Sequence, residues 1–159
     1  MFVPGVPAPQ GSKRSVPIYA GRGEDRTFTG RVALLESSKP RVDAWRADVR
    51  HAVEAALAGA APLDGPVRLR IAFVLPRPKA TPKRRPTPAA VKQPDVDKTA
   101  RSTADALTSA GAYRDDAQIV ELAVTKRIAE LDEPPGAWID LAPCAAVPAP
   151  PTCDEEVTG

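Results

Sequence analysis

Histidine and cysteine are scarce in this chain of 159 residues, and their scarcity excludes several classes of catalytic site. His51 is the only histidine, and it falls in a segment with helical spacing, which argues against a Ser-His-Asp or Cys-His site. The two cysteines, Cys144 and Cys153, lie near the C-terminal end, and no Cys/His cluster has the spacing of a zinc site. No apolar run approaches the roughly 20 residues of a membrane-spanning helix, and no signal-peptide core is visible. These absences predict a soluble, cytoplasmic protein.

Aromatic residues are also few, whereas proline is abundant, with 19 residues. The prolines gather in the first 17 residues, between positions 76 and 94, and after position 134. A single domain with a modest core and Pro-rich connections fits this distribution. We expect a folded domain over residues 1–141, followed by a disordered Ala/Pro-rich and acidic tail over residues 142–159.

The net charge of +2 hides an uneven distribution of charge. Residues 1–94 contain 17 Lys and Arg against 7 Asp and Glu, a net of +10, whereas residues 95–159 contain 5 against 13, a net of −8. This asymmetry indicates either a basic nucleic-acid surface beside an acidic site or tail, or two solvated surfaces of opposite sign. The Pro-rich segment 76–92 is likewise either a mobile surface loop or a basic loop along a phosphate backbone. The residues predicted to contact DNA are Lys13, Arg14, Lys83, Arg84, Arg85 and Lys98.

Hydrophobic periodicity predicts two helices and several strands. Apolar residues recur at helical spacing over residues 38–58, where Ser37 or Ser38 can cap the start, and over residues 97–110. Alternating patterns predict strands at 66–75, 117–128 and 136–141, with an edge strand near Phe2 and Val3. Residues 16–36 form short strands or a flexible flap. This order predicts an α+β fold, a mixed sheet covered on one face by two helices.

The segment Gln93-Pro94-Asp95-Val96-Asp97-Lys98 is the first candidate site. Pro94 favours extended backbone, in which residues i and i+2 point to the same side, so Asp95 and Asp97 present two carboxylates together. A second acidic pair, Asp115 and Asp116, precedes the predicted strand 117–128. Extending the strand alternation backwards places Asp116, rather than Asp115, on the helix-covered face, provided that no bulge intervenes.

Three neighbouring carboxylates require a counter-charge, and Mg²⁺ prefers such oxygen ligands. Such an ion activates water against a phosphodiester, so the set predicts a nuclease. Each aspartate alone can equally be a helix cap or a turn residue. Arg101 is either a fixed cation beside the site or a surface partner of Asp97 and Asp105.

Several segments together resemble the RusA family of Holliday junction resolvases. They are residues 4–14, Gly65-Pro66, Pro76-Arg77-Pro78-Lys79, Pro94-Asp95-x-Asp97, Asp105-Ala106-Leu107 and Tyr113-Arg114-Asp115-Asp116-Ala117-Gln118-Ile119-Val120. The resemblance covers residues 2–141. It implies a homodimer that binds four-way DNA junctions and makes paired symmetric nicks in recombination and repair. It also implies Mg²⁺, with Mn²⁺ as a substitute, held by Asp95, Asp97 and Asp116. A phage or prophage origin is a further expectation.

Two positions depart from the family pattern. Lys98 stands where the family has Asn, and Arg101 stands where it has an active-site Lys, so the charge remains but an easily released proton does not. The resemblance implies that Arg101 belongs to the catalytic set. Two alternatives stay open: a non-catalytic DNA-binding module, and a restriction-like nuclease. The latter's Pro-Asp…Glu-x-Lys signature is only half present, because no Glu-x-Lys follows Pro94-Asp95.

Overall fold

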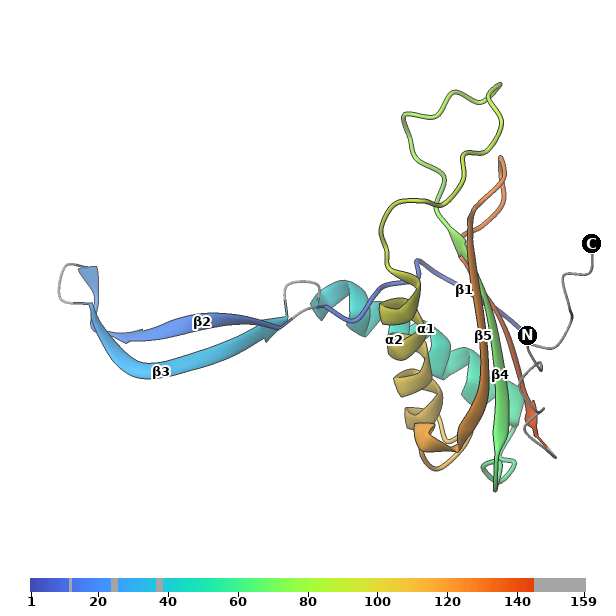
Figure 1. Cartoon of the computed structure of the whole chain (residues 1–159), viewed down its shortest axis with the longest axis horizontal. Helices are drawn as coiled ribbons and strands as arrows, with labels where there is room; N and C mark the ends of the chain where they lie inside the picture. The colour runs from blue at the N-terminus through green and yellow to red at the C-terminus, as the bar shows by residue number, and fades with distance from the viewer. Residues whose placement is uncertain (12, 24–25, 37–38, 145–159) are drawn as a thin grey trace, which may run out of the picture.

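A four-stranded sheet, two helices on one of its faces and a separate two-stranded arm make up the fold (Figure 1). The computed structural model describes residues 1–11, 13–23, 26–36 and 39–144, without the side chains of residues 13, 14 and 34–36. The predicted tail therefore lies almost entirely outside the described residues.

The sheet has the strand order β1-β6-β4-β5. The strands are β1 (Phe2–Pro4), β4 (Val67–Leu75), β5 (Ile119–Ile128) and β6 (Gly136–Pro143). Strand β4 runs parallel to β5 and antiparallel to β6, so the sheet is mixed, as the sequence predicts. Strand β1 forms one edge and β5 forms the other. Strand β6 continues through Ala142 and Pro143, which extends the folded domain beyond the predicted boundary at residue 141.

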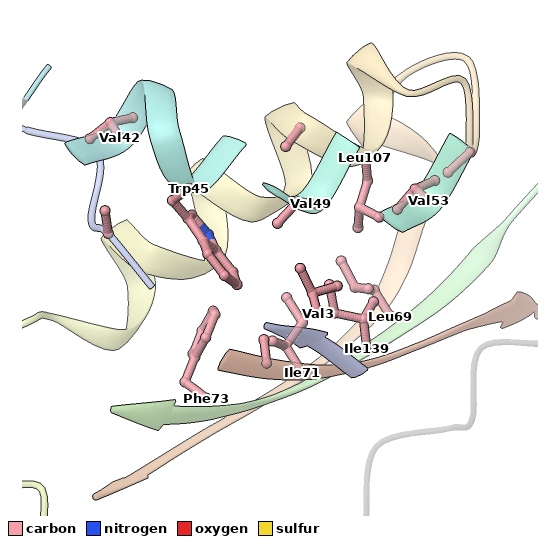
Figure 2. Packing of buried hydrophobic residues seen from close by; sticks show 14 of the residues in the cluster. Val3, Val42, Trp45, Val49, Val53, Leu69, Ile71, Phe73, Leu107 and Ile139 are labelled. Carbon is pink, nitrogen blue, oxygen red and sulfur yellow. The ribbon is translucent and has the colours of Figure 1, made fainter. Parts of the chain in front are cut away.

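Helices α1 (Lys39–Leu57) and α2 (Val96–Ser109) cover one face of the sheet and close the core (Figures 1 and 2). Trp45 is buried from α1, and its ring meets that of Phe73 on β4 edge-on at a centroid distance of 6.5 Å. Both helices match their predicted positions within a few residues. The predicted caps Ser37 and Ser38 lie outside the described residues.

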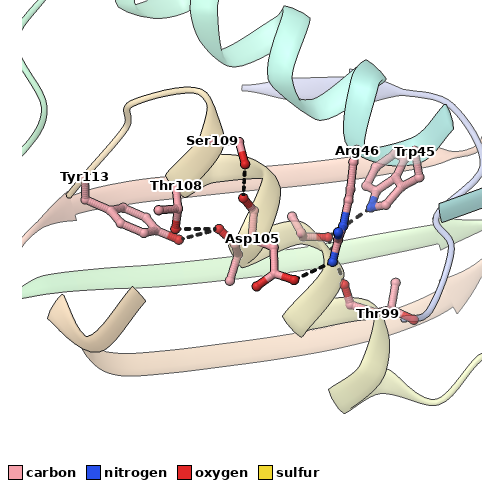
Figure 3. Close-up of polar contacts among 9 residues, drawn as sticks. Trp45, Arg46, Thr99, Asp105, Thr108, Ser109 and Tyr113 are labelled. Carbon is pink, nitrogen blue, oxygen red and sulfur yellow. Dashed lines mark hydrogen bonds and ion pairs between the residues drawn. The ribbon is translucent and has the colours of Figure 1, made fainter. Parts of the chain in front are cut away.

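Polar contacts fix α2 against α1 (Figure 3). The Trp45 indole Nε1 donates to the Thr103 hydroxyl at 3.0 Å, inside the core. At the border of the helix pair, Arg46 forms an ion pair with Asp105. A buried hydrogen bond is costly to break because its partner is then left unsatisfied, so these contacts fix the rotation of α2 and hence the direction of its first turn.

The start of β5 differs from the predicted strand. Residues Asp116–Gln118 form a short 3-10 turn, and the pairing register with β4 shifts between Val67 and Arg68. Ile119 therefore pairs with the buried Val67, and the side chain of Val120 is 40% exposed rather than inward. The condition placed on the strand alternation, that no bulge intervenes, is not met.

The opposite face of the sheet is solvated and polar at its centre. Arg70 forms an ion pair with Glu121 at 3.1 Å. Near the β1 edge Trp138 is 55% exposed, and its ring packs on that of Phe2 at 5.1 Å between centroids. One covered face and one solvated face account for the alternation read from the sequence.

Strands β2 (Lys13–Ala20) and β3 (Thr27–Glu36) form an antiparallel arm, where the sequence predicts short strands or a flap. The arm extends away from the sheet (Figure 1). Its described side chains are largely exposed, including Tyr19 and Phe28, whose ring centroids lie 5.9 Å apart. Arg26 lies over the Tyr19 ring at 4.8 Å.

Candidate active site

Asp95 occupies the N-cap position of α2 but does not use its side chain as a cap. The backbone carbonyl of Asp95 accepts hydrogen bonds from Thr99, from the amide at 3.1 Å and from the hydroxyl at 2.8 Å. The carboxylate instead faces Lys98, whose Nζ lies 3.2 Å away. The side chain of Asp95 is 48% exposed. The capping alternative is therefore wrong for this carboxylate, which remains accessible to a ligand.

Asp97 is exposed in the first turn of α2. The helix begins at Val96, one residue before the predicted start, so only Asp95 of the pair has extended backbone. The same-side argument assumed an extended segment through Asp97, and that premise is wrong. The two carboxylates share the N-terminal end of α2 because they are two residues apart, where the helix dipole and free amide groups favour negative charge.

A cleft of about 910 Å³ opens beside Asp95. The cleft is bordered by the N-terminal segment 5–11, by α1 and by the end of β4. The backbone amide of Gln10 donates to the carbonyl of Lys98 at 3.0 Å, which ties the N-terminal segment to the first turn of α2. The charged residues that line the cleft are Arg41, Asp48, Asp95 and Lys98. The cleft gives a phosphodiester room beside the Asp95 carboxylate.

Lys126 on β5 supports this region and was missed from the sequence. Its Nζ donates to the carbonyls of Lys92 at 2.9 Å and Pro94 at 2.8 Å, directly before Asp95. The register pairs Lys126 with the buried Phe73, so the lysine lies on the helix-covered face. The sequence did contain a signal for this residue. Lys126 falls between Val124 and Ile128 in the strand alternation, which places a charged side chain on the predicted inner face.

The turn before β5 separates the roles of its two aspartates. The carboxylate of Asp115 accepts from the Ala117 amide at 2.8 Å and caps the 3-10 turn. Gln118 accepts from the amides of Arg114 and Asp115, and its Nε2 donates to the carbonyl of Gly65 at 2.8 Å. In the part of the chain that the structure describes, Asp116 is exposed and its carboxylate makes no hydrogen bond or ion pair. Asp116 is therefore the better candidate ligand because the carboxylate of Asp115 is already used as a cap, and not because of the strand alternation from which Asp116 was predicted.

Tyr113 holds the connection between α2 and this turn. Its ring is buried, and its hydroxyl donates to the carbonyl of Ala104 at 3.0 Å (Figure 3). Burial raises the pKa of Tyr113 to about 12, and the nearby charges of Asp116 and Asp105 act in the same direction. The turn that carries Asp115 and Asp116 is therefore anchored to α2 by Tyr113, whose buried phenol is neutral.

This burial predicts a stability change at high pH. Between pH 10 and 12 the unfolded chain releases a phenolic proton that the folded chain retains, so stability falls as pH rises through that window. The loss assigned to Tyr113 is about 1 kcal/mol between pH 9 and 11. In urea titrations Tyr113→Phe should lose correspondingly less stability over that interval. The control is Tyr19→Phe at the exposed Tyr19, and equal losses in wild type and Tyr113→Phe would contradict the prediction.

One chain does not gather the three predicted carboxylates. Asp95 and Asp97 lie at the start of α2, whereas Asp116 follows its end (Figure 1). A helix of 14 residues separates them by about 20 Å. Among the residues that the structure describes, no three Asp, Glu, His or Cys side chains are grouped to hold a metal ion. A single copy thus does not fit a three-carboxylate magnesium site.

Arg101 is exposed on α2, one turn after Asp97. The predicted surface pairing of Arg101 with Asp105 does not form, because Asp105 pairs with Arg46. Within the described ranges Arg101 has no ion pair, so its guanidinium is free to meet a phosphate.

The predicted DNA contacts fall into three groups. Lys83, Arg84 and Arg85 are exposed on the loop that joins β4 to α2. Lys98 is held beside Asp95. The side chains of Lys13 and Arg14 lie outside the described residues, although their backbone belongs to β2.

Comparison with known proteins agrees with the resemblance seen in the motifs. Among curated proteins none matches the chain. In the described residues no helix is both long and apolar enough to cross a membrane. The profile of the family described as Endodeoxyribonuclease RusA matches residues 16–140, a stretch that contains Asp95, Asp97, Arg101 and Asp116. This match covers most of the sequence, and the chain therefore belongs to the RusA family of endodeoxyribonucleases, whose members are Holliday junction resolvases.

Proposed function

We propose that this chain resolves four-way DNA junctions by paired symmetric nicks, as a Mg²⁺-dependent homodimer. The observation that carries the proposal is that the aspartates at the two ends of α2 differ in whether their side chains cap a helix or turn. The carboxylate of Asp95 is accessible beside a cleft, and Asp97 is exposed in the same turn of the helix. Asp116 is exposed as well, while its neighbour Asp115 caps the turn. Asp95 does not cap the helix with its side chain, unlike Asp115 at its turn, and family membership supports a role in cleaving branched DNA.

The separation of Asp116 from the other two aspartates supports a site shared between two copies. Strand β5 is an edge of the sheet, and it exposes Val120 by 40% and Leu122 by 55%. An unpaired apolar edge favours pairing with another strand. Pairing of β5 with its own copy about a two-fold axis is antiparallel, so the start of one strand meets the end of the other. Lys126, near the end of β5, holds the carbonyl before Asp95, so this pairing brings Asp116 of the partner subunit toward Asp95 and Asp97.

Such a shared set of carboxylates matches the oxygen ligands that Mg²⁺ prefers, and Mn²⁺ is expected to substitute. The metal, when bound, would polarise the scissile phosphate and activate water. Lys98 forms an ion pair with Asp95 at 3.2 Å, which holds this carboxylate near the cleft. Arg101 adds a fixed positive charge on the exposed face of α2, where it can orient a phosphate.

The N-terminal end of α2 favours bound phosphate as well, because the first amide groups of a helix have no partners within the helix. Lys83, Arg84 and Arg85 lie on the loop that leads into this end. With Lys13, Arg14 and Lys98 they supply a sequence-independent attraction for the DNA backbone. The proposed DNA surface therefore surrounds the proposed site of cleavage.

The test uses purified full-length protein, a synthetic four-way junction, and a linear duplex of the same sequence. With Mg²⁺ or Mn²⁺, we expect two nicks at symmetry-related positions of the junction and no cleavage of the duplex. Junction binding without cleavage in either metal would instead identify a non-catalytic DNA-binding module. Cleavage of the linear duplex at a defined sequence would identify a restriction-like nuclease.

A further inference from the structure

The loop of residues 76–94, which joins β4 to α2, is organised around one arginine. Arg77 is half-buried at its start. Its guanidinium donates from Nη1 to the Thr87 hydroxyl at 2.6 Å, and from Nη2 to the carbonyls of Arg85 at 2.7 Å and Pro82 at 3.4 Å. One planar donor group thus holds three positions of a Pro-rich segment that has no helix or strand of its own.

A second layer of contacts fastens this loop to the sheet. The Thr87 hydroxyl donates in turn to the carboxylate of Glu130, a residue of the connection between β5 and β6. Residues 76–94 arch beyond the end of the sheet, beside the β5–β6 connection (Figure 1). At the other end of the arch, Lys126 binds the carbonyls of Lys92 and Pro94. The loop is therefore held at its start, its middle and its end.

The inward contacts separate the cations of the loop into two kinds. Arg77 points into the arch and is occupied by protein oxygens. The remaining cations are exposed, and they are Lys79, Lys83, Arg84, Arg85 and Lys92. A loop ordered before binding loses less conformational freedom when it meets a phosphate backbone than a free loop does. The sequence alone gives no basis for this division, because all six residues are basic.

We propose that Arg77, Thr87 and Glu130 form a clasp that holds the basic loop as a preorganised phosphate-binding arch, with Arg77 as a positioning residue rather than a DNA ligand. This proposal rests on the proposed DNA-binding function, and it adds that an acidic residue, Glu130, promotes the binding of a polyanion. Simple electrostatics predicts the opposite for Glu130, because removal of a negative charge near DNA strengthens attraction. For removal of the Glu130 carboxylate, the clasp therefore predicts weaker DNA binding, whereas simple electrostatics predicts tighter binding.

Three variants of the full chain test the clasp: Arg77→Ala, Thr87→Val and Glu130→Ala. They change the net charge by −1, 0 and +1, yet each removes one link of the clasp. We expect all three to weaken binding to the four-way junction by roughly tenfold, the equivalent of one lost charge-assisted contact. Arg77→Lys should behave like Arg77→Ala, because a lysine keeps the charge but lacks the fork of donors. An unchanged affinity for Thr87→Val together with tighter binding by Glu130→Ala would overturn the proposal.

Limited trypsin digestion without DNA separates failure of the clasp from failure of the proposed function. The exposed Lys83-Arg84-Arg85 run provides cleavage sites within the loop, and Thr87→Val and Glu130→Ala leave those sites unchanged. Loss of the clasp should increase the rate of cutting at Lys83 and Arg84, with no increase at Arg46 in α1 as the control for global unfolding. Faster cutting combined with no DNA binding by wild type would retain the clasp and reject the DNA function. Unchanged cutting in both variants would reject the clasp whatever the DNA affinity.

Discussion

Asp95→Asn and Asp116→Asn are each expected to abolish junction cleavage while junction binding persists. Each change removes one negative charge from a proposed metal ligand and preserves the size of the side chain. A Lewis-acid metal contributes several kcal/mol to phosphodiester cleavage, so the rate of nicking should fall by roughly 100- to 1000-fold or more. The measurement is single-turnover nicking of a labelled junction in Mg²⁺, beside a binding assay in Ca²⁺.

Asp115→Asn is the matched control, because it makes the same chemical change one residue away. Asp115 caps the 3-10 turn through a carboxylate oxygen, and an Asn side-chain oxygen can accept the same hydrogen bond from Ala117. We expect this variant to cleave at a rate close to that of wild type. If Asp115→Asn were inactive and Asp116→Asn active, the assignment of Asp116 would be wrong.

Mixing two inactive variants is expected to restore cleavage. In the proposed dimer each site takes Asp95 and Asp97 from one subunit and Asp116 from the other. A heterodimer of Asp95→Asn and Asp116→Asn subunits therefore has one site with both defects and one site with none. We expect the mixture, after subunit exchange, to nick junctions on one strand, although neither parent homodimer does so.

The same mixture distinguishes a shared site from a site within one chain. If all three aspartates served one site within each chain, each subunit of the heterodimer would carry a defect and the mixture would stay inactive. Co-expression of two differently tagged variants, with purification through both tags, ensures that heterodimers are present. Leu122→Arg on the exposed edge of β5 is the control: it should prevent pairing of the subunits and keep the mixture inactive, with little effect on the fold of one chain.

Periodicity predicted the two helices and the strands of the sheet, because each element buries one face and so repeats its apolar residues at a fixed spacing. The order of these elements then predicted the mixed sheet. The same reasoning failed at the ends of elements, where capping and register decide the direction of a side chain. Helix α2 begins at Val96 and so removes the extended backbone assumed for Asp97. The register shift opposite Val67 similarly removes the strand parity assumed for Asp116.

The distance between Asp97 and Asp116 could have been predicted from the sequence. Asp97 was predicted to open a helix and Asp116 to follow it, and a helix of that length spans about 20 Å. Contacts between distant segments could not be predicted. No feature of the neighbouring sequence indicates that Thr87 binds Glu130, or that Lys126 binds the Pro94 carbonyl. Such contacts depend on how separate segments pack, and a single sequence does not encode them in its periodicity.

The two tryptophans differ in their surroundings in a way that makes the protein its own fluorescent reporter. Trp45 is sealed in the core beside Phe73, whereas Trp138 is more than half exposed on the outer face near the β1 edge. An aqueous quencher such as iodide or acrylamide will reach the indole of Trp138 and will scarcely reach that of Trp45. Trp138→Phe leaves a single chromophore whose emission wavelength follows the integrity of the helix–sheet core, and Trp45→Phe leaves one that follows the solvated face. Unfolding and events at the sheet surface can then be recorded separately, without a dye attached to the chain.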